Sequence, residues 1–163
     1  MTEIIPKLSV VISVRDEELQ LAECLQTLQF ADEIVVLLDQ CTDGSEGVAR
    51  KYTDCIFSGS WEKEGNRRNA GIEACTGDWV FEVDADERVS RALASEIKRT
   101  IQTSEADWHE IPVDNFIGNR LVRWGWGASF GKAAYPGLFR RGVKNWGSQR
   151  VHPCLTWSGR KGP

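Results

Sequence analysis

The sequence of 163 residues lacks the patterns that mark membrane-spanning, secreted and repetitive proteins. No apolar run approaches the roughly 20 residues that a membrane-spanning helix needs. The first residues contain no basic stretch followed by an apolar one, so no secretory signal is expected and the predicted compartment is the cytosol. No internal repeat is present. With 41% hydrophobic and 27% charged residues, the whole chain, 1–163, is predicted to form one globular domain.

Patterns for zinc binding and for disulfide scaffolds are also missing. The five cysteines are odd in number, and no two of them have C-x-x-C spacing. Only two histidines, His109 and His152, are available as further ligands. A zinc site is therefore not expected, and the cysteines are predicted to be free, mostly buried thiols.

Acidic residues are absent after Asp114. Residues 1–114 carry 24 acidic and 11 basic side chains, a net charge of −13, whereas residues 115–163 carry 9 basic side chains and a net charge of +9. Two interpretations are open: a basic surface that balances an acidic half, or a segment that faces a nucleotide diphosphate or an anionic membrane. Nucleic acid is not expected as a partner, because the isoelectric point is about 5.3 and no reader motif is present.

The first hundred residues alternate between strand-like and helix-like patterns. Strands are predicted at 8–14, 33–38, 55–57 and 79–83, and helices after Asp16, from Asp43 to about Tyr52, at 64–75 and after Ser90. Asp16 and Ser90 are predicted to be helix N-caps, and Asp43-x-x-Glu46 is predicted to form a capping box. This alternation predicts a Rossmann-like α/β fold with a mainly parallel central sheet flanked by helices.

After residue 105 the pattern is less regular. Strands are expected at 108–116, 138–140 and 151–155, around a loop rich in glycine and tryptophan at 123–127. Residues 1–105 are therefore interpreted as a nucleotide-binding half and residues 106–163 as a substrate-side half. The tryptophans of the second half have two possible roles, stacking on sugar rings or packing in the core: Trp124, Trp126, Trp146 and Trp157.

Polar clusters follow the predicted strands, at the edge of the sheet where open α/β folds bind ligands. These clusters are Ser13–Asp16, Asp39–Asp43, the segment before Arg67-Arg68-Asn69, and Asp84–Glu87. No glycine-rich dinucleotide fingerprint and no P-loop is present, so a divalent metal is expected to hold the phosphates instead. Asp84-x-Asp86 places two carboxylates where both can bind one Mg²⁺ or Mn²⁺. The alternative is a solvated turn that supports the next helix.

These motifs, in this order, resemble those of the family 2 glycosyltransferases. The matching segments are 8–18, 35–39, Thr42-Asp43-Gly44, 68–72 and 77–87. Pro136–Arg141 and Val151-His152 resemble the branch related to lipopolysaccharide core glucosyltransferases. The resemblance covers nearly the whole chain and implies a GT-A fold with an acceptor-side second half.

The resemblance implies an inverting transfer of sugar from a UDP-sugar to a glycan or glycolipid acceptor, as in lipopolysaccharide core or cell-envelope polysaccharide synthesis. Ser13, Arg15 and Glu17 would line the donor pocket, and Asp39 would accept a hydrogen bond from the uracil imide. Arg68 and Asn69 would lie near the base or the diphosphate. Asp84 would contact ribose or metal, and Asp86 would be the main metal ligand and a catalytic residue.

Three departures from the family pattern stand out. Asp16 occupies a position where the family usually has Asn. Pro153 stands where the related branch has the glutamate expected to act as general base, which leaves His152 as the candidate base or as a structural residue. The family usually continues beyond the point where this chain stops, so the chain is expected to be a fragment or a degenerate copy.

Two other functions remain open. A nucleotidyltransferase would need a glycine-rich loop after the first strand, and Ser13-Val14-Arg15-Asp16-Glu17 contains no glycine. A catalytically impaired nucleotide-binding module is favoured by the missing glutamate and the short chain.

Overall fold

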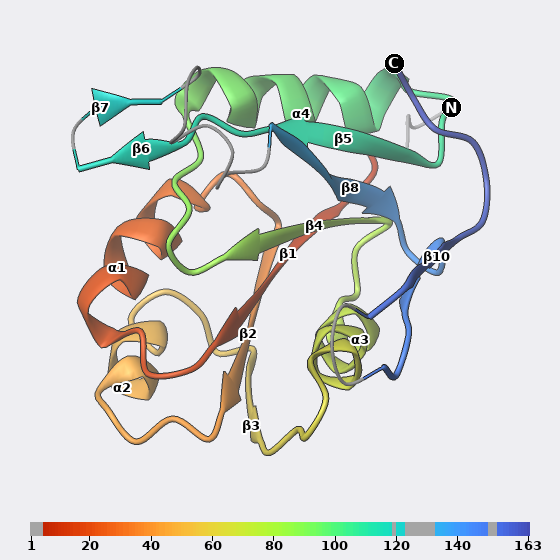
Figure 1. Cartoon of the computed structure of the whole chain (residues 1–163). Coiled ribbons are helices and arrows are strands. Elements are labelled where there is room, and N and C mark those ends of the chain that lie inside the picture. The colour runs from red at the N-terminus through yellow and green to blue at the C-terminus, as the bar shows by residue number, and fades with distance from the viewer. Residues whose placement is uncertain (1–4, 119, 123–132, 150–152) are drawn as a thin grey trace.

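A six-stranded sheet forms the centre of the protein in a computed structural model, which describes residues 5–118, 120–122, 133–149 and 153–163 (Figure 1). The strand order is β3-β2-β1-β4-β8-β5. Its members are β1 (Leu8–Val14), β2 (Glu33–Asp39), β3 (Ile56–Gly59), β4 (Trp79–Asp84), β5 (Trp108–Pro112) and β8 (Ala134–Arg140). The first four strands are parallel to one another, whereas β8 is antiparallel to both β4 and β5. The predicted mainly parallel α/β sheet is confirmed.

Helices cover both faces of the sheet. The helices are α1 (Glu18–Thr27), α2 (Ser45–Ala49), α3 (Glu64–Ala74) and α4 (Arg91–Thr103). Leu21 of α1 and Ile97 of α4 pack with Ile12 of β1 in one apolar core, while Ile72 of α3 packs with Val11 of the same strand in a second core. Alternate residues of β1 thus point to opposite faces, and the apolar run of the strand is explained by burial on both sides.

Ser90 caps α4 as predicted, because its hydroxyl accepts the backbone N–H of Leu93 at 3.1 Å. The predicted cap by Asp16 is wrong. Asp16 has a positive φ of 53°, and its Oδ1 accepts the N–H groups of Thr42 and Asp43 instead. At the start of α1, the N–H of Glu18 instead donates to Oδ2 of Asp43, which is distant in the sequence, at 2.9 Å.

The predicted capping box at the start of α2 is also not formed. Asp43 Oδ1 does accept the N–H of Ser45 at 3.0 Å. Glu46, however, pairs with Arg50 one turn later at 2.6 Å rather than reaching back to the helix start. Asp43, in the loop after β2, therefore makes a tertiary contact with the start of α1 in place of the predicted capping box.

The second half forms small sheets beside the main one. β6 (Phe116–Ile117) pairs with β7 (Arg120–Leu121), and β9 (Lys144–Trp146) pairs with β10 (Leu155–Trp157). The strand expected at 108–116 ends at residue 112, and the one expected at 151–155 meets β10 only at its last residue. Residues 151 and 152 lie outside the described part of the chain.

Contacts among three aromatic rings join β10 to the main sheet. The indole of Trp157 stacks on that of Trp108 with 4.6 Å between ring centroids, and Phe139 meets Trp157 edge-on at 5.8 Å. Trp157 is half-buried and packs against the core, whereas Trp124 and Trp126 lie outside the described residues. None of the described helices is long and apolar enough to cross a membrane.

All five cysteines are free, as predicted, but the prediction that most are buried is wrong: Cys24 and Cys75 are buried, Cys41 and Cys55 are half-buried, and Cys154 is exposed. Burial raises the pKa of each of the two buried thiols to about 12. They remain protonated near neutral pH and serve as small apolar side chains.

Candidate functional site

The carboxyl ends of β1, β2 and β4 meet at one edge of the sheet. Ser13 of β1 is paired across the sheet with Leu37 on one side and with Asp84 on the other, and Asp39 ends β2 opposite Gly59. The parallel register thus brings together side chains that are far apart in the sequence. We call this group the carboxyl-edge site. It includes Asp86 and the basic residues that contact Asp39 or Asp84.

Asp39 lies at this edge as a buried carboxylate, 2% exposed. Its Oδ2 is 3.1 Å from the guanidinium of Arg67 and 4.0 Å from that of Arg15, and its Oδ1 accepts the N–H of Trp61 at 3.2 Å. A buried carboxylate is stable only when charge and hydrogen bonds compensate it. Arg67 supplies the nearer positive charge and one hydrogen bond, and Trp61 supplies the other hydrogen bond. The Nε of Arg67 is buried with no hydrogen-bond partner among the described residues.

Sequence analysis did not assign a role to Arg67. Successive residues of a helix point about 100° apart, so Arg67 faces the end of β2 while Arg68 faces β4. The family motif drew attention to Arg68 alone. The available signal for Arg67 was its place in the first turns of α3, the helix that follows β3, which pairs with β2.

Arg68 distributes its guanidinium over three carboxylates. Nε lies 2.9 Å from Glu64, one terminal nitrogen lies 2.7 Å from Glu82, and the other lies 3.1 Å from Asp84. Burial would lower the pKa of Arg68, but the negative charges of Glu82 and Asp84 raise it above its ordinary value. Arg68 is therefore a fixed cation beside Asp84.

Glu82 and Lys144 are two buried charges that sequence analysis missed. Glu82 Oε2 is 2.5 Å from Lys144 Nζ, which also donates to the carbonyl oxygen of Pro136 at 3.0 Å. Glu82 lies in the interior of β4, where its neighbours in sequence read simply as a buried strand. A glutamate inside such a strand was itself the available signal, because a buried carboxylate requires a cation.

Asp84 and Asp86 flank the end of β4 in different environments. Asp84 is held by Arg68 and its side chain is 40% exposed, while Asp86 is exposed on the following turn. Glu87 turns back: its Oε2 accepts the N–H of Asp84 at 3.1 Å and lies 3.1 Å from the hydroxyl of Tyr135, and burial raises its pKa. Accessible carboxylate oxygens are the donors that Mg²⁺ and Mn²⁺ prefer, so Asp84 and Asp86 fit a divalent cation.

A further acidic group lies at the ends of β1 and β2. Potential ligand atoms of Asp16, Cys41 and Asp43 all lie within 4.8 Å of one another. Two backbone N–H groups already occupy Asp16 Oδ1, and burial raises the pKa of the Cys41 thiol. A protonated thiol is a poor partner for Mg²⁺ or Mn²⁺, so these residues fit such an ion less well than Asp84 and Asp86 do.

The remaining predicted residues occupy varied positions. Ser13 is half-buried at the end of β1, the side chain of Arg15 is 58% exposed, and Glu17 immediately precedes α1. Asn69 uses its amide on the backbone of Trp146, donating to its carbonyl at 2.8 Å and accepting its N–H at 2.9 Å. Asn69 thus ties α3 to β9, and its substrate-binding role stays a prediction.

The candidate base and its neighbour lie at the limit of the description. His152 lies outside the described residues. Pro153 is half-buried near the first turn of α3, where a Cβ placed on Gly65 would lie 3.4 Å from the Cβ of Pro153. Of the two other carboxylates considered as bases, Glu110 pairs with Lys161 at 2.9 Å and Asp114 is exposed.

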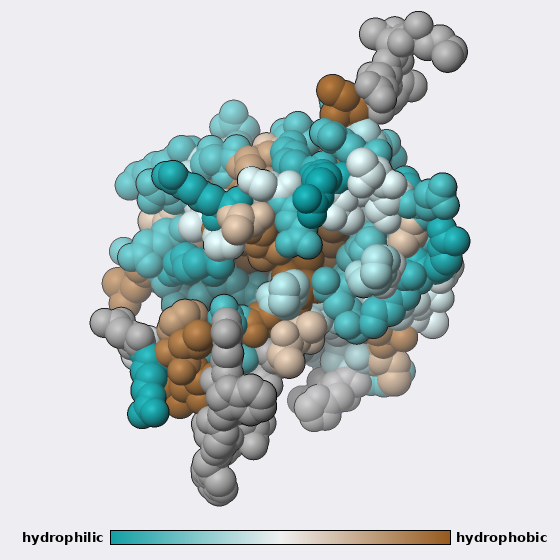
Figure 2. Space-filling view, turned by 90° about the horizontal axis from the view of Figure 1, so that it is seen from above, coloured by the Kyte–Doolittle hydropathy of each residue, from teal (hydrophilic) through white to brown (hydrophobic). Residues whose placement is uncertain are grey.

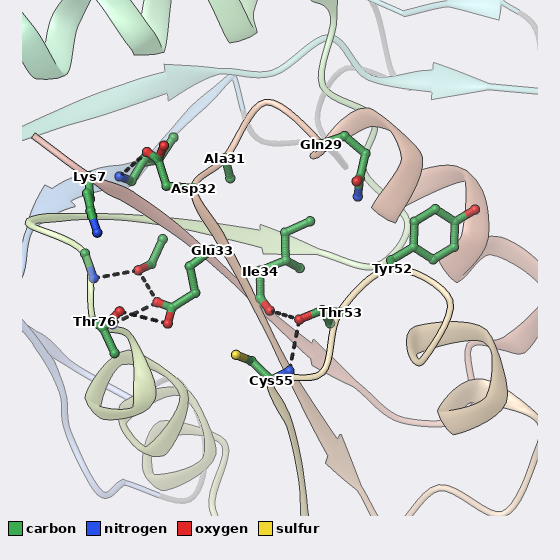
Figure 3. Close-up of a pocket in the computed structure, with 13 residues that line it drawn as sticks. Lys7, Gln29, Ala31, Asp32, Glu33, Ile34, Tyr52, Thr53, Cys55 and Thr76 are labelled. Atoms are coloured by element: carbon green, nitrogen blue, oxygen red, sulfur yellow. Dashed lines mark hydrogen bonds between the residues drawn. The ribbon is translucent and has the colours of Figure 1, made fainter. Parts of the chain in front are cut away.

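A pocket of about 450 Å³ lies elsewhere, at the amino end of β1 and β2 (Figure 3). Several of its polar side chains are engaged within the protein. Glu33 accepts hydrogen bonds from Thr76 and Ser9, and Asp32 accepts from Lys98 and from the backbone of Leu8. Ligands of open α/β sheets bind at the carboxyl edge, so this pocket is separate from the carboxyl-edge site.

The mainly parallel sheet, with carboxylates and guanidinium groups at the carboxyl ends of its strands, is an α/β domain with the GT-A fold of solved glycosyltransferases. The chain belongs to glycosyl transferase family 2, whose family description matches residues 9–160.

Relatives with curated names are distant and longer. The lipopolysaccharide core biosynthesis glycosyltransferase LpsC of Rhizobium meliloti (strain 1021) is 27% identical over 97% of this chain and 61% of LpsC. An uncharacterized glycosyltransferase of Rickettsia typhi, RT0209, is 26% identical over 62% of this chain and 35% of its own length. The chain thus spans less than two thirds of the length of either relative.

Solved structures share the fold at lower identity. S. aureus TarS 1-349 in complex with UDP-GlcNAc superimposes with a TM-score of 0.59 at 22% identity, over 71% of this chain and 36% of that one. Glucosyl-3-phosphoglycerate synthase of Mycobacterium tuberculosis, in complex with Mn²⁺, UDP and glucosyl-3-phosphoglycerate, superimposes with a TM-score of 0.54 at 18% identity, over 64% of this chain and 43% of that one.

Proposed function

We propose that this chain is the donor-binding part of an inverting glycosyltransferase that transfers sugar from a UDP-sugar to a glycan or glycolipid. The observation that carries the proposal is the carboxyl-edge site. Asp39 ends β2 and Asp84, paired with Arg68, ends β4, on either side of β1, and Asp86 follows β4. Support comes from LpsC, whose name places it in lipopolysaccharide core biosynthesis, and from TarS, whose structure contains UDP-GlcNAc.

Asp39 is the residue that would select uridine. Uracil offers an imide N–H, and a carboxylate that Arg67 and the N–H of Trp61 hold in one place can accept it without reorganising. Arg15, which is exposed and 4.0 Å from Asp39, would supply positive charge at the mouth of the same pocket. Ser13 and Glu17 lie along the same edge and would complete its wall.

Asp84 and Asp86 would hold Mg²⁺ or Mn²⁺. Such a cation neutralises the charge on the departing nucleoside diphosphate. Arg68 keeps the Asp84 carboxylate in a fixed orientation, while exposed Asp86 remains open to a ligand. The two aspartates would therefore differ as ligands: the protein fixes the orientation of Asp84, whereas Asp86 would be free to turn toward the cation.

Catalytic impairment is the second candidate, favoured by Pro153. The resemblance places a general base at this position, and proline can neither accept nor donate a proton. His152 would then have to remove the proton from the acceptor hydroxyl, as neutral imidazole can near pH 7. Without such a base the chain would bind donor and transfer little.

We also propose contact with an anionic membrane surface on the cytoplasmic side. Phe116 and Ile117 of the β6–β7 hairpin are 60% and 65% exposed, beside exposed Arg120. Figure 2 looks down on this side of the molecule and shows apolar atoms gathered next to strongly hydrophilic ones at the rim. Apolar side chains next to a cation favour the boundary between lipid headgroups and acyl chains.

A thermal-shift comparison of nucleotides tests the proposed donor. UDP with Mn²⁺ should raise the melting temperature, since ligand at a hundred times its Kd adds about 2.7 kcal/mol of stability. GDP and ADP should stabilise less, because neither guanine nor adenine presents the uracil imide to Asp39. Equal stabilisation by the three nucleotides would contradict the uridine assignment.

Asp86→Ala should remove the metal-dependent part of the shift without unfolding the protein, because Asp86 is exposed.

A further inference from the structure

We propose that Lys144 and Glu82 are positioning residues for Asp84, acting through Arg68. This inference rests on the proposed function. The four side chains form a continuous series of ion pairs, Lys144–Glu82–Arg68–Asp84, that begins in the interior under β9 and ends at the carboxyl-edge site. We call this series the ionic chain.

Lys144 is the buried end of the ionic chain. Its side chain is 2% exposed, and its Nζ lies 4.9 Å from the ring centroid of Phe139, 4.7 Å from that of Trp146 and 5.3 Å from that of Trp157. Three aromatic faces attract a cation but cannot replace its water shell alone. The carboxylate of Glu82 therefore fixes where the ammonium group lies.

Glu82 divides its two oxygens between two cations. Oε1 accepts from Arg68 at 2.7 Å, and Oε2 accepts from Lys144. Each cation limits the rotation of the Glu82 carboxylate and so keeps the other oxygen in place for the other cation. Without Lys144, one oxygen of a carboxyl group that is 7% exposed would lose its charged partner.

Arg68 links the buried Glu82 to the more exposed Asp84. The guanidinium group is planar and rigid, so fixing Nε on Glu64 and one terminal nitrogen on Glu82 also fixes the direction of the third nitrogen, which meets Asp84. Of the two carboxylates in the ionic chain, Asp84 is the more accessible, with 40% of its side chain exposed. Its carboxylate is therefore oriented from within before any ligand arrives.

β9 reaches this place because α3 holds it. Asn69 makes both hydrogen bonds to the backbone of Trp146, at 2.8 Å and 2.9 Å, and Arg68 lies 5.1 Å from the centroid of the Trp146 ring. The chain of β9 and β10 runs beside α3 in Figure 1. The second half of the protein thereby sets the geometry of a donor-side carboxylate.

Stability alone does not explain these charges. A well-packed apolar replacement of a buried ion pair is often neutral or stabilising, whereas removing one partner leaves an uncompensated charge. An ionic chain that ends on an accessible carboxylate has a second effect, because it orients that carboxylate. The outer partners of metal ligands typically contribute 10–100-fold to metal affinity.

The test separates orientation from packing with the double variant E82M/K144M, which removes both charges and retains apolar volume. Isothermal titration would measure the affinity for UDP with and without Mn²⁺, and the affinity for uridine alone. We expect the Mn²⁺-dependent gain in UDP affinity to fall roughly tenfold in this variant. Uridine affinity should be unchanged, and the melting temperature should be unchanged or higher.

Two further variants complete the experiment. K144M should lose the same gain in affinity with a lower melting temperature, because Glu82 is then buried without its ammonium partner. K161M is the matched control: Lys161 also lies over an indole ring, at 5.5 Å from the centroid of Trp108, and pairs with Glu110, outside the ionic chain. It should bind UDP with the wild-type dependence on Mn²⁺.

Full retention of the Mn²⁺-dependent gain in E82M/K144M would overturn the inference, since Lys144 and Glu82 would then serve packing alone. A parallel loss of uridine affinity, or the same loss in K161M, would also overturn it by showing general damage. If the wild-type chain binds no UDP with Mn²⁺, the proposed function fails and this inference fails with it.

Discussion

At the scale of single residues, the proposed recognition of the donor depends on the charge pair of Arg67 and Asp39. Asp39 is 2% exposed and Arg67 lies 3.1 Å from it. Arg67→Met should lower the free energy of unfolding by about 3 kcal/mol, because it leaves a buried carboxylate without its main cation. It should also weaken uridine binding, since Asp39 would be free to turn. Urea unfolding and calorimetric titration with uridine measure the two effects.

Arg50→Met is the control for this prediction. Arg50 pairs with Glu46 one helical turn away, and its side chain is 61% exposed. Exposed pairs of this kind contribute a few tenths of a kcal/mol, so stability and uridine affinity should barely change. A small effect of Arg67→Met, similar to that of Arg50→Met, would show that Arg15 and the N–H of Trp61 suffice to hold Asp39.

His109 makes stability depend on pH. It is buried on β5, where its Nε2 lies 2.8 Å from the hydroxyl of Ser104, and burial lowers its pKa below the ordinary value of 6.5. The unfolded chain therefore binds a proton more readily than the folded one. Stability is full above pH 6.5 and is lost as pH falls through 6.5 toward the pKa of the folded state.

His109→Gln should flatten this dependence. Glutamine cannot titrate, and it retains an amide that can hydrogen-bond to Ser104. Urea unfolding of the two proteins above and below pH 6.5 gives the comparison. Asp32 and Glu33 have lowered pKa values and lose their contribution only in more acidic solution, so they do not interfere. Identical pH profiles would mean that His109 does not carry the effect.

Sequence predicted part of the carboxyl-edge site because strand ends are visible in a linear pattern. Asp39, Asp84 and Asp86 follow buried strands, and parallel register brings those ends together. Glu82 and Lys144 escaped detection because their pairing joins positions 62 residues apart through tertiary packing. Local periodicity contains no information about such a pair.

The reliability of prediction at the scale of elements follows the length of the repeating pattern. β1, β2 and β4 have six or seven residues and buried apolar runs, so their bounds are close to those predicted. β9 and β10 have three residues each, too few to show a period. The cap assigned to Asp16 failed because a loop from another part of the chain offered the start of α1 a better acceptor.

The β6–β7 hairpin is the element expected to touch lipid. Replacing Phe116 and Ile117 by serine should weaken binding to phosphatidylglycerol vesicles and leave UDP binding unchanged, because both side chains are largely exposed. Phe57→Ser, at an exposed phenylalanine on β3, should leave vesicle binding unchanged. Vesicle sedimentation measures the difference. Equal binding by all variants, or binding to neutral vesicles as strong as to anionic ones, would exclude this hairpin as the contact.

Transfer of sugar is a property of the whole molecule, and we expect this chain to bind UDP-sugar but to transfer it slowly. A general base contributes about 10²–10⁴-fold to rate, and Pro153 cannot supply one. Pro153→Glu should raise the rate of transfer. If His152 serves as base, His152→Ala should abolish the remaining transfer without weakening UDP binding. Product formation with radiolabelled UDP-sugar is the measurement. Rapid transfer that neither substitution changes would move attention to Glu110 and Asp114.

The position of β8 has a consequence for how the protein is made. β8 comes from the second half of the chain but lies between β4 and β5, so the edge of β4 has no partner until residues 134–140 have been synthesised. Until then the nascent chain presents an unpaired, apolar strand edge, the kind of surface that associates with other chains. Ribosome-bound chains halted before residue 134 should therefore recruit chaperones, and chains that extend past β8 should release them.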